Sequence, residues 1–217
     1  MIQLYYSPGT ACLAPHFLME ELGLPYELVL VDTSKKEHQQ PAYLQLNPNG
    51  KIPLLIDGDL QLTESAAICM YLADQYPDSS KTNNFSPALG TPARAQLYQW
   101  MMYLTNTLQA ELLTYFYPDR LSEDEACTAQ VKAKAEQRVA QMLEYVDANL
   151  AKSKGAYLLG TQLSLADLFL FMLCRWTRGM QKPARAYPHI GPYLNVLLER
   201  PSIAKAFKME GVEAPFY

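Results

Sequence analysis

The composition of the chain changes once, between Pro77 and Pro92, where proline, serine, asparagine and glycine accumulate. Such a stretch is typical of a linker between domains. Before it, short β-rich runs alternate with helical patterns, and after it apolar residues recur only at helical spacing. The 217 residues therefore predict an α/β domain at 1–78, a linker at 79–90 and an all-helical domain at 91–217.

The first domain is predicted to begin with a βαβ unit, which makes part of its sheet parallel. A hairpin closed by Asp57-Gly58-Asp59 and a further helix follow. The expected strands cover residues 2–6, 26–31, 53–56 and 60–62. The expected helices cover residues 13–21, 35–45 and 64–76, of which the second is expected to be polar and irregular.

The second domain is predicted to be a helical bundle, because apolar residues recur three or four apart in two long segments. These residues are Leu97, Met101, Leu104, Leu108 and Leu112 in the first segment and Val131, Ala135, Val139, Met142, Val146 and Leu150 in the second. Ser164 and Asp167 have the spacing of a capping box and precede a helix that is apolar on nearly every side. We expect that helix in the middle of the bundle, with shorter helices at 190–199 and 202–208 after it.

Charge and cysteine content exclude several classes of protein. The net charge is −4 with no block of like charges, so a nucleic acid is not an expected partner. No signal peptide is visible, and the most apolar segment, Leu168–Cys174, is far shorter than the ~20 residues of a membrane span. The four cysteines are too scattered for a zinc site or a C-x-x-C pair. We therefore expect a soluble, reduced, cytoplasmic protein with no metal and no membrane partner.

The turn Ser7–Cys12, between the first strand and the first helix, is one candidate site. Thr10, Ala11 and Cys12 enter the first helical turn, where unpaired N–H groups and the helix dipole favour an anion. A cysteine thiolate is stabilised at such a place, and its pKa falls below the usual value of about 8.5. The alternative is that Cys12 is a small, buried apolar residue.

A second candidate is the turn Asn49–Pro53, which ends in an X-Pro bond before a strand. A cis bond between Ile52 and Pro53 would turn the main-chain groups of Ile52 toward a ligand. An extended peptide pairs with such groups as an added strand. The alternative is an ordinary strand start with a trans proline.

A third candidate is the junction Thr63–Ser65, where a strand runs directly into a helix. Ser65 offers a hydroxyl and main-chain N–H groups to a carboxylate, and Glu64 can hold an ammonium group. Together they suit the head group of an α-amino acid. The alternative is that Thr63 caps the helix while Glu64 complements its dipole.

These motifs resemble those of the cytosolic glutathione transferases and are most similar to the bacterial beta class. The matching segments, which span nearly the whole chain, are Tyr5–Gly9 with Leu13–His16, Asn47–Pro53, Thr63–Ile68 and Leu163–Asp167. The resemblance implies a thioredoxin-like N-terminal domain that binds glutathione as co-substrate. It also implies an all-helical C-terminal bundle that forms a pocket for a hydrophobic electrophile, a homodimer, and a role in detoxification.

The resemblance also implies roles for individual residues. Ile52, before a cis Pro53, would pair with the cysteinyl backbone of glutathione, and Glu64 with Ser65 would take its γ-glutamyl end. Lys36 falls where the family places a lysine near a glutathione carboxylate. The remaining implied contacts are Ala11, Lys51 and Gln109 for glutathione and Phe116 and Trp176 for the electrophile pocket.

The catalytic position departs from the beta-class pattern. Ala11 occupies the usual cysteine position, and Cys12 lies one place later, where a serine is common. Either the loop shifts to present Cys12 to the glutathione sulfur, or a hydroxyl of Thr10, Tyr6 or Ser7 takes over. In the first bundle helix, moreover, Gln109 replaces the usual histidine and Met102 a common asparagine. A glutamine can hydrogen-bond but carries no proton at neutral pH.

The expected function is therefore glutathione transfer, in which glutathione is held as a thiolate that attacks a hydrophobic electrophile. A variant of the same site would run isomerisation or reduction of a mixed disulfide. The alternative is a protein that sequesters glutathione or apolar ligands with little turnover, since the usual cysteine and histidine are replaced. A thioredoxin-type reductase is disfavoured, because no second cysteine lies within three residues of Cys12.

Overall fold

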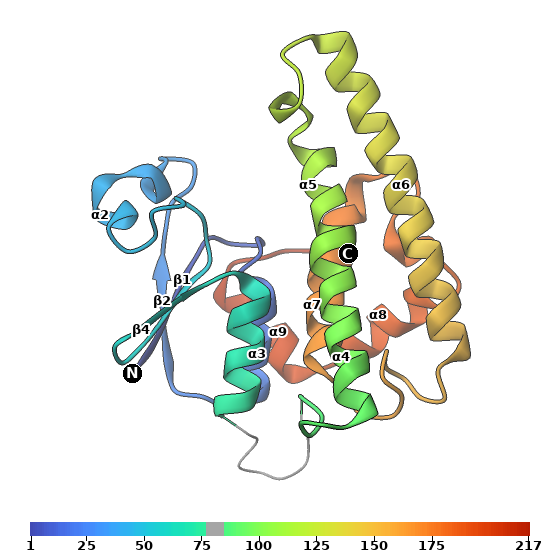
Figure 1. Cartoon of the computed structure of the whole chain (residues 1–217), viewed down its shortest axis with the longest axis horizontal. Coiled ribbons are helices and arrows are strands. Elements are labelled where there is room, and N and C mark those ends of the chain that lie inside the picture. The colour runs from blue at the N-terminus through green and yellow to red at the C-terminus, as the bar shows by residue number, and fades with distance from the viewer. Residues whose placement is uncertain (77–84) are drawn as a thin grey trace. The chain divides into compact units, whose positions relative to one another are not determined.

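The structure, a computed structural model, describes residues 1–76 and 85–217 (Figure 1). The chain divides into two compact units, Met1–Ser86 with Leu198–Ala214 and Pro87–Leu197 with Pro215–Tyr217. The C-terminal segment Leu198–Ala214 therefore groups with the first unit, whereas the sequence analysis assigns it to the helical domain. Residues 79–84 of the predicted linker lie outside the described residues.

The first unit is built on a four-stranded sheet with the strand order β2-β1-β3-β4. Its strands are β1 (Ile2–Tyr6), β2 (Tyr26–Leu30), β3 (Leu54–Asp57) and β4 (Leu60–Thr63). β1 and β2 are parallel, as a βαβ unit requires, and β3 is antiparallel to both of its neighbours. Each strand lies within one residue of its predicted bounds, so the pattern of the first domain is confirmed.

Helices pack beside this sheet and complete the core of the unit. They are α1 (Leu13–Glu21), α2 (Pro41–Leu44), α3 (Ser65–Gln75) and α9 (Pro201–Met209). Helix α1 is buried from Leu13 to Met19 because it packs against both α3 and α9. The rings of Phe17 and Phe207 meet edge to face at 5.3 Å, which fixes α9 on α1.

The single helix expected at residues 35–45 is not formed. A 3₁₀ turn at Glu37–Gln39 is followed by the four-residue helix α2. Pro41 has no N–H group and cannot continue a helix, but it is well suited to start one. The prediction was therefore wrong in continuity, although it was right that this segment is irregular.

The second unit is a bundle of helices (Figure 1). They are α4 (Pro92–Tyr103), α5 (Ala110–Phe116), α6 (Glu125–Lys152), α7 (Leu165–Trp176) and α8 (Ile190–Leu198). Helix α7 is buried from Leu165 to Arg175, which confirms its predicted central place. Its capping box is formed: the Asp167 carboxylate accepts hydrogen bonds from the N–H (2.8 Å) and the hydroxyl (2.6 Å) of Ser164.

The long helix at the start of the second unit is not uniform. A π-helical segment, Leu104–Gln109, separates α4 from α5. The apolar residues predicted to face inward along this helix are all fully buried: Leu97, Met101, Leu104, Leu108 and Leu112. Spacings of three and four residues fit an α-helix as well as this wider segment, so the sequence pattern did not distinguish them. Such π-helical turns often mark functional positions.

Candidate functional site

One end of the sheet gathers the segments that the sequence singles out. Tyr5 pairs with Leu54 and Leu54 pairs with Thr63, so the end of β1, the start of β3 and the end of β4 lie side by side. β2 runs parallel to β1 and ends there too. The segments at this end are residues 7–12 after β1, Lys36 after β2, residues 51–53 before β3 and residues 64–65 after β4.

The loop between β1 and α1 is folded around Thr10. The Thr10 hydroxyl donates to the main-chain oxygen of Ser7 at 2.7 Å, and the Thr10 main-chain oxygen accepts from the N–H of Leu13 at 3.2 Å. Gly9 has φ +71°, a conformation that favours glycine. The partly buried Thr10 and Ala11 therefore lie at the very start of α1.

Cys12 does not have the environment that the sequence analysis expects. Its side chain is fully buried, and the Thr10 hydroxyl lies 3.2 Å from its sulfur. Burial raises the pKa of the Cys12 thiol to about 12, and the hydrogen bonds that favour the thiolate offset only part of this rise. The expectation of a lowered pKa is therefore wrong, because burial outweighs the helix start.

Tyr6 is the third candidate for contact with a sulfur atom. Its side chain is partly buried, and burial together with the charge of Glu210 raises the pKa of its phenol. The phenol is therefore protonated at neutral pH and can donate a hydrogen bond. Ser7 is buried, and its hydroxyl lies 3.2 Å from that of Thr33.

The turn before β3 presents main-chain groups, as expected. The bond between Ile52 and Pro53 is cis, which confirms that prediction. The main-chain oxygen of Lys51 accepts hydrogen bonds from the Tyr43 hydroxyl and the Asn47 amide, both at 2.6 Å. Within residues 1–76 and 85–217, the N–H and C=O groups of Ile52 make no hydrogen bond. They are thus available to an extended peptide.

The junction of β4 and α3 is strained. Glu64 has φ +67° and ψ 111°, which is uncommon for a residue other than glycine. Backbone strain of this kind clusters at binding sites, where the surrounding structure maintains it. Ser65 is buried at the first position of α3, and Glu64 is exposed beside it. The two side chains are therefore placed together at the start of a helix.

The segment after β2 contains Lys36 and one residue that the sequence analysis missed. Lys36 is exposed and has φ +57°. The ring of His38 has a buried Nδ1 atom with no hydrogen-bond partner in the described part of the chain. No sequence motif includes His38. Its Nδ1 atom is identified only by being buried without a hydrogen-bond partner among the described residues.

The remaining predicted residues belong to the second unit. The rings of Phe116 and Trp176 lie 6.4 Å apart and nearly perpendicular, so the structure brings together the two residues expected to bind an electrophile. Phe116 is 44% exposed and ends α5. Gln109 is partly buried and is the last residue of the π-helical segment.

The comparisons with known proteins agree with this geometry. Residues 2–74 match the family model of the glutathione S-transferase N-terminal domain, and residues 106–209 match that of the C-terminal domain. Glutathione S-transferase GstA of Escherichia coli O157:H7 is 30% identical over 98% of this chain and 100% of its own length. The chain belongs to the glutathione S-transferase family.

Solved structures of this family are similar over nearly the whole chain. A glutathione transferase homologue from Sulfitobacter, crystallised with bound glutathione, is 32% identical with a TM-score of 0.86, over 98% of this chain and 99% of its own. The beta-class glutathione S-transferase of Sphingomonas chungbukensis is 30% identical with a TM-score of 0.83, over 97% of this chain and 100% of its own. The thioredoxin-like and helical domains of the family are thus both present.

Three further observations complete the site description. Among the described residues, no group of histidine, cysteine, aspartate and glutamate side chains is arranged to hold a metal ion. The described helices include none of sufficient length and apolarity to span a bilayer. The Glu210 carboxylate, which no motif indicated, accepts a hydrogen bond from Gly9 N–H at 2.9 Å. Glu210 lies 201 residues from Gly9, so sequence spacing gave no signal for it.

Proposed function

We propose that the protein is a glutathione transferase that binds glutathione at the end of the sheet described above. The single observation that carries this proposal is the strand register, which gathers four separate segments at that end in a chain of this family. The glutathione thiol is held as a thiolate and attacks a hydrophobic electrophile. The protein contributes ionisation and positioning of the sulfur.

The tripeptide is held by main-chain and polar groups. Ile52 pairs with the cysteinyl backbone of glutathione through main-chain groups that make no other hydrogen bond in the described residues. Glu64 and Ser65 hold the γ-glutamyl ammonium and carboxylate, since Ser65 is at the N-terminal end of α3. Lys36 and Lys51, both exposed, supply positive charge for the remaining carboxylate.

Thr10 is the residue that donates to the glutathione thiolate. Thr10 is a partly buried residue in the loop just before α1, whereas Cys12 is fully buried and its thiol has a raised pKa. A neutral hydroxyl that donates to a thiolate lowers the pKa of the bound thiol. Tyr6 remains a second donor, and Ala11 contributes only main-chain contact.

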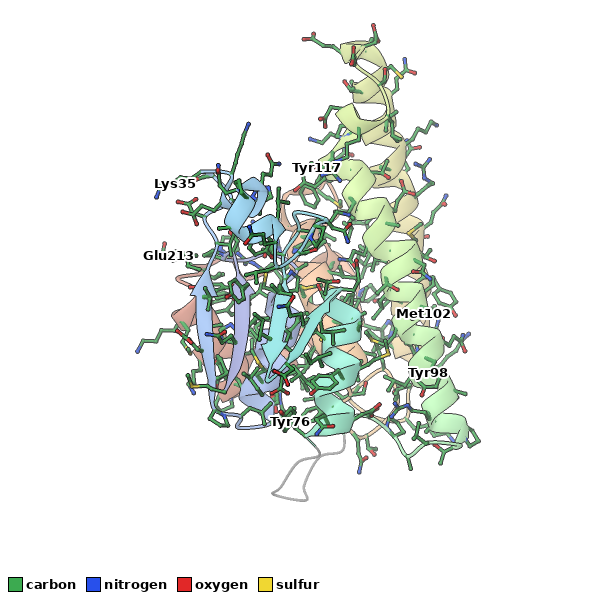
Figure 2. The ribbon with its side chains drawn as sticks, turned by 60° about the vertical axis from the view of Figure 1, so that its left-hand side comes forward. Lys35, Tyr76, Tyr98, Met102, Tyr117 and Glu213 are labelled. Carbon is green, nitrogen blue, oxygen red and sulfur yellow. The ribbon has the colours of Figure 1, made fainter. Side chains whose placement is uncertain are left out.

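The electrophile is bound by the aromatic pair Phe116 and Trp176, which offers apolar surface. The family resemblance alone is the ground on which Gln109, a neutral hydrogen-bonding residue, is assigned to glutathione. We further propose that the protein is a cytoplasmic homodimer that acts in detoxification. Tyr98 and Met102, which are exposed on α4, suit a contact with a second copy of the chain (Figure 2). Sedimentation of wild type and Met102→Glu tests the dimer.

The test of the function is an ultraviolet difference titration with glutathione across pH, which measures thiolate absorbance. Cys127 is the exposed cysteine, so the Cys127→Ala variant removes the protein thiol that solvent reaches in the native state. Saturable thiolate formation near neutral pH, with conjugation to an aryl halide, is expected. Binding without ionisation would indicate a sequestering protein instead, and absence of binding would overturn the proposal.

A further inference from the structure

A single buried carboxylate links the C-terminal segment to the loop that begins α1. Glu210 Oε2 accepts a hydrogen bond from Gly9 N–H at 2.9 Å, and Oε1 lies 2.7 Å from His16 Nδ1 on α1. The side chains of Glu210 and His16 are both fully buried. The proposed function uses neither of them, although a buried charge costs free energy unless it is paired and hydrogen-bonded.

The protons of this network can be assigned from its contacts. Tyr26 donates its only hydroxyl proton to Glu20, so its oxygen accepts the hydrogen bond of 2.8 Å from His16 Nε2–H. His16 and Glu210 then share one proton, either as an ion pair or as two neutral groups. The buried carboxylate is therefore paired with His16, although its charge still raises the pKa of the nearby Tyr6 phenol. Glu20 is itself paired with Lys205 at 2.8 Å, so its charge is compensated too.

Helix α9 is a firm support for this carboxylate. Arg200, at the start of α9, forms an ion pair with Glu21 of α1, with 2.6 Å between Nη2 and Oε2. The ring contact of Phe17 with Phe207 holds the second half of the helix. At its end, the N–H of Glu210 donates to the main-chain oxygen of Ala206 at 3.0 Å. Glu210 is thus fixed on both its main-chain and its side-chain atoms.

We propose that Glu210 is a positioning residue of the transferase: by holding Gly9 N–H, it fixes the neighbouring Thr10 at the place where the glutathione sulfur is bound. The inference rests on the proposed function. Glycine at φ +71° has many other conformations available, so an unanchored Gly9 would let Thr10 move. A misplacement of about 1 Å can lower a rate about 100-fold.

The test compares substitutions of Glu210 with a matched control, Glu213→Ala. Glu213 is an exposed carboxylate three residues further along the same segment (Figure 2). Glu210→Ala removes both contacts. Glu210→Gln keeps them, because its amide oxygen accepts from Gly9 N–H and its amide nitrogen donates to a neutral His16. Glu210→Asp keeps the charge but is too short to hold both partners.

For Glu210→Ala, kcat is expected to fall by about 10-fold to 100-fold, and the pKa of bound glutathione is expected to rise. KM for glutathione should change less than about 3-fold, because the contacts of Ile52, Glu64 and Ser65 remain. Glu210→Gln should restore kcat to within about 3-fold of wild type. Glu213→Ala should match wild type. Unfolding by urea, followed in parallel, separates these effects from loss of folded protein.

The outcomes decide between positioning and charge. Folded Glu210→Ala with wild-type kcat and thiol pKa would overturn the inference, and so would Glu210→Gln that is as slow as Glu210→Ala. If Glu210→Ala does not fold, Glu210→Asp and Glu210→Gln decide: positioning predicts the faster rate for Glu210→Gln, and a charge effect predicts the reverse. Wild type that forms no thiolate would overturn the proposed function and this inference with it, whereas active wild type with insensitive Glu210 variants overturns the inference alone.

Discussion

Replacing the hydroxyl of Thr10 tests the proposed chemistry most directly. Thr10→Val keeps the shape of the side chain and removes only the donor. A hydrogen bond to a charged group contributes about 1.5–3 kcal/mol, and one pKa unit corresponds to about 1.4 kcal/mol. The pKa of bound glutathione should therefore rise by about 1–2 units. The lower value is favoured, because the hydroxyl already donates to the Ser7 oxygen at 2.7 Å and must exchange that acceptor for the sulfur.

The pH dependence of the rate shows the direction in which Thr10→Val changes the pKa of bound glutathione. Below the wild-type pKa of the bound thiol, the thiolate fraction and hence the rate of Thr10→Val should be about 10-fold to 100-fold lower. As pH rises through the raised pKa, the two rates should converge. Stopped-flow conjugation at saturating glutathione, measured from pH 5 to pH 10, gives both curves.

Three control variants decide which group donates. Thr10→Ser retains the hydroxyl and should behave as wild type. Cys12→Ala should leave the thiol pKa of bound glutathione unchanged, because the Cys12 thiol is buried and protonated. A normal pH profile for Thr10→Val combined with a shifted profile for Tyr6→Phe would transfer the role to the phenol. A shifted profile for Cys12→Ala alone would refute the argument from burial.

Three further predictions concern stability and reactivity. Asp167 is fully buried and accepts four hydrogen bonds, so Asp167→Ala should lower the free energy of unfolding in urea by about 3 kcal/mol, and a loss below about 1 kcal/mol would contradict this. Cys127 is the exposed cysteine, so one thiol should react with iodoacetamide in the native protein and four after denaturation; two native equivalents would show that a second site opens. Burial alone would raise the pKa of Asp147, but hydrogen bonds from His189 and the N–H of Ile190 outweigh it and lower the pKa. Stability from a lowered carboxylate pKa is present above the unfolded value of about 3.9 and is lost as pH falls through the folded pKa. The stability advantage over Asp147→Asn should therefore shrink below about pH 4, and an advantage that stays constant down to pH 2 would contradict this.

The local elements followed from the sequence because they depend on short-range patterns. Period-two runs and turn residues located every strand to within one residue. The spacing of Ser164 and Asp167 predicted a capping box that is formed as expected. The prediction of one helix at 35–45 was wrong because Pro41 cannot continue a helix and instead starts α2. Short-range sequence patterns were thus sufficient to predict features that depend on a single helix, strand or turn.

Tertiary packing decided the features that the sequence did not reveal. The C-terminal segment has the same helical pattern as the bundle, so nothing local indicates that α9 packs on α1 through Phe17 and Phe207. The position of Cys12 at a helix start was predicted correctly, but its pKa also depends on how deeply that helix start is buried. Cys12 and the residues Leu13–Met19 that follow it are all buried, and desolvation then dominates the helix dipole.

The departure from the beta-class pattern, in which the usual cysteine is replaced by Ala11, is consistent with a hydroxyl donor at Thr10. The side chain of Cys12 is fully buried, while Thr10 keeps a hydroxyl donor in the loop just before α1. A hydroxyl donor needs no tuning of its own pKa, but a hydrogen bond depends steeply on distance and angle. Catalysis by such a donor thus requires a well-fixed loop, and the loop is fixed by the carboxylate of Glu210 on Gly9. The same reasoning explains why a buried carboxylate is retained so close to a site that must stabilise an anion: His16 pairs with it, and its other oxygen holds Gly9 N–H in place.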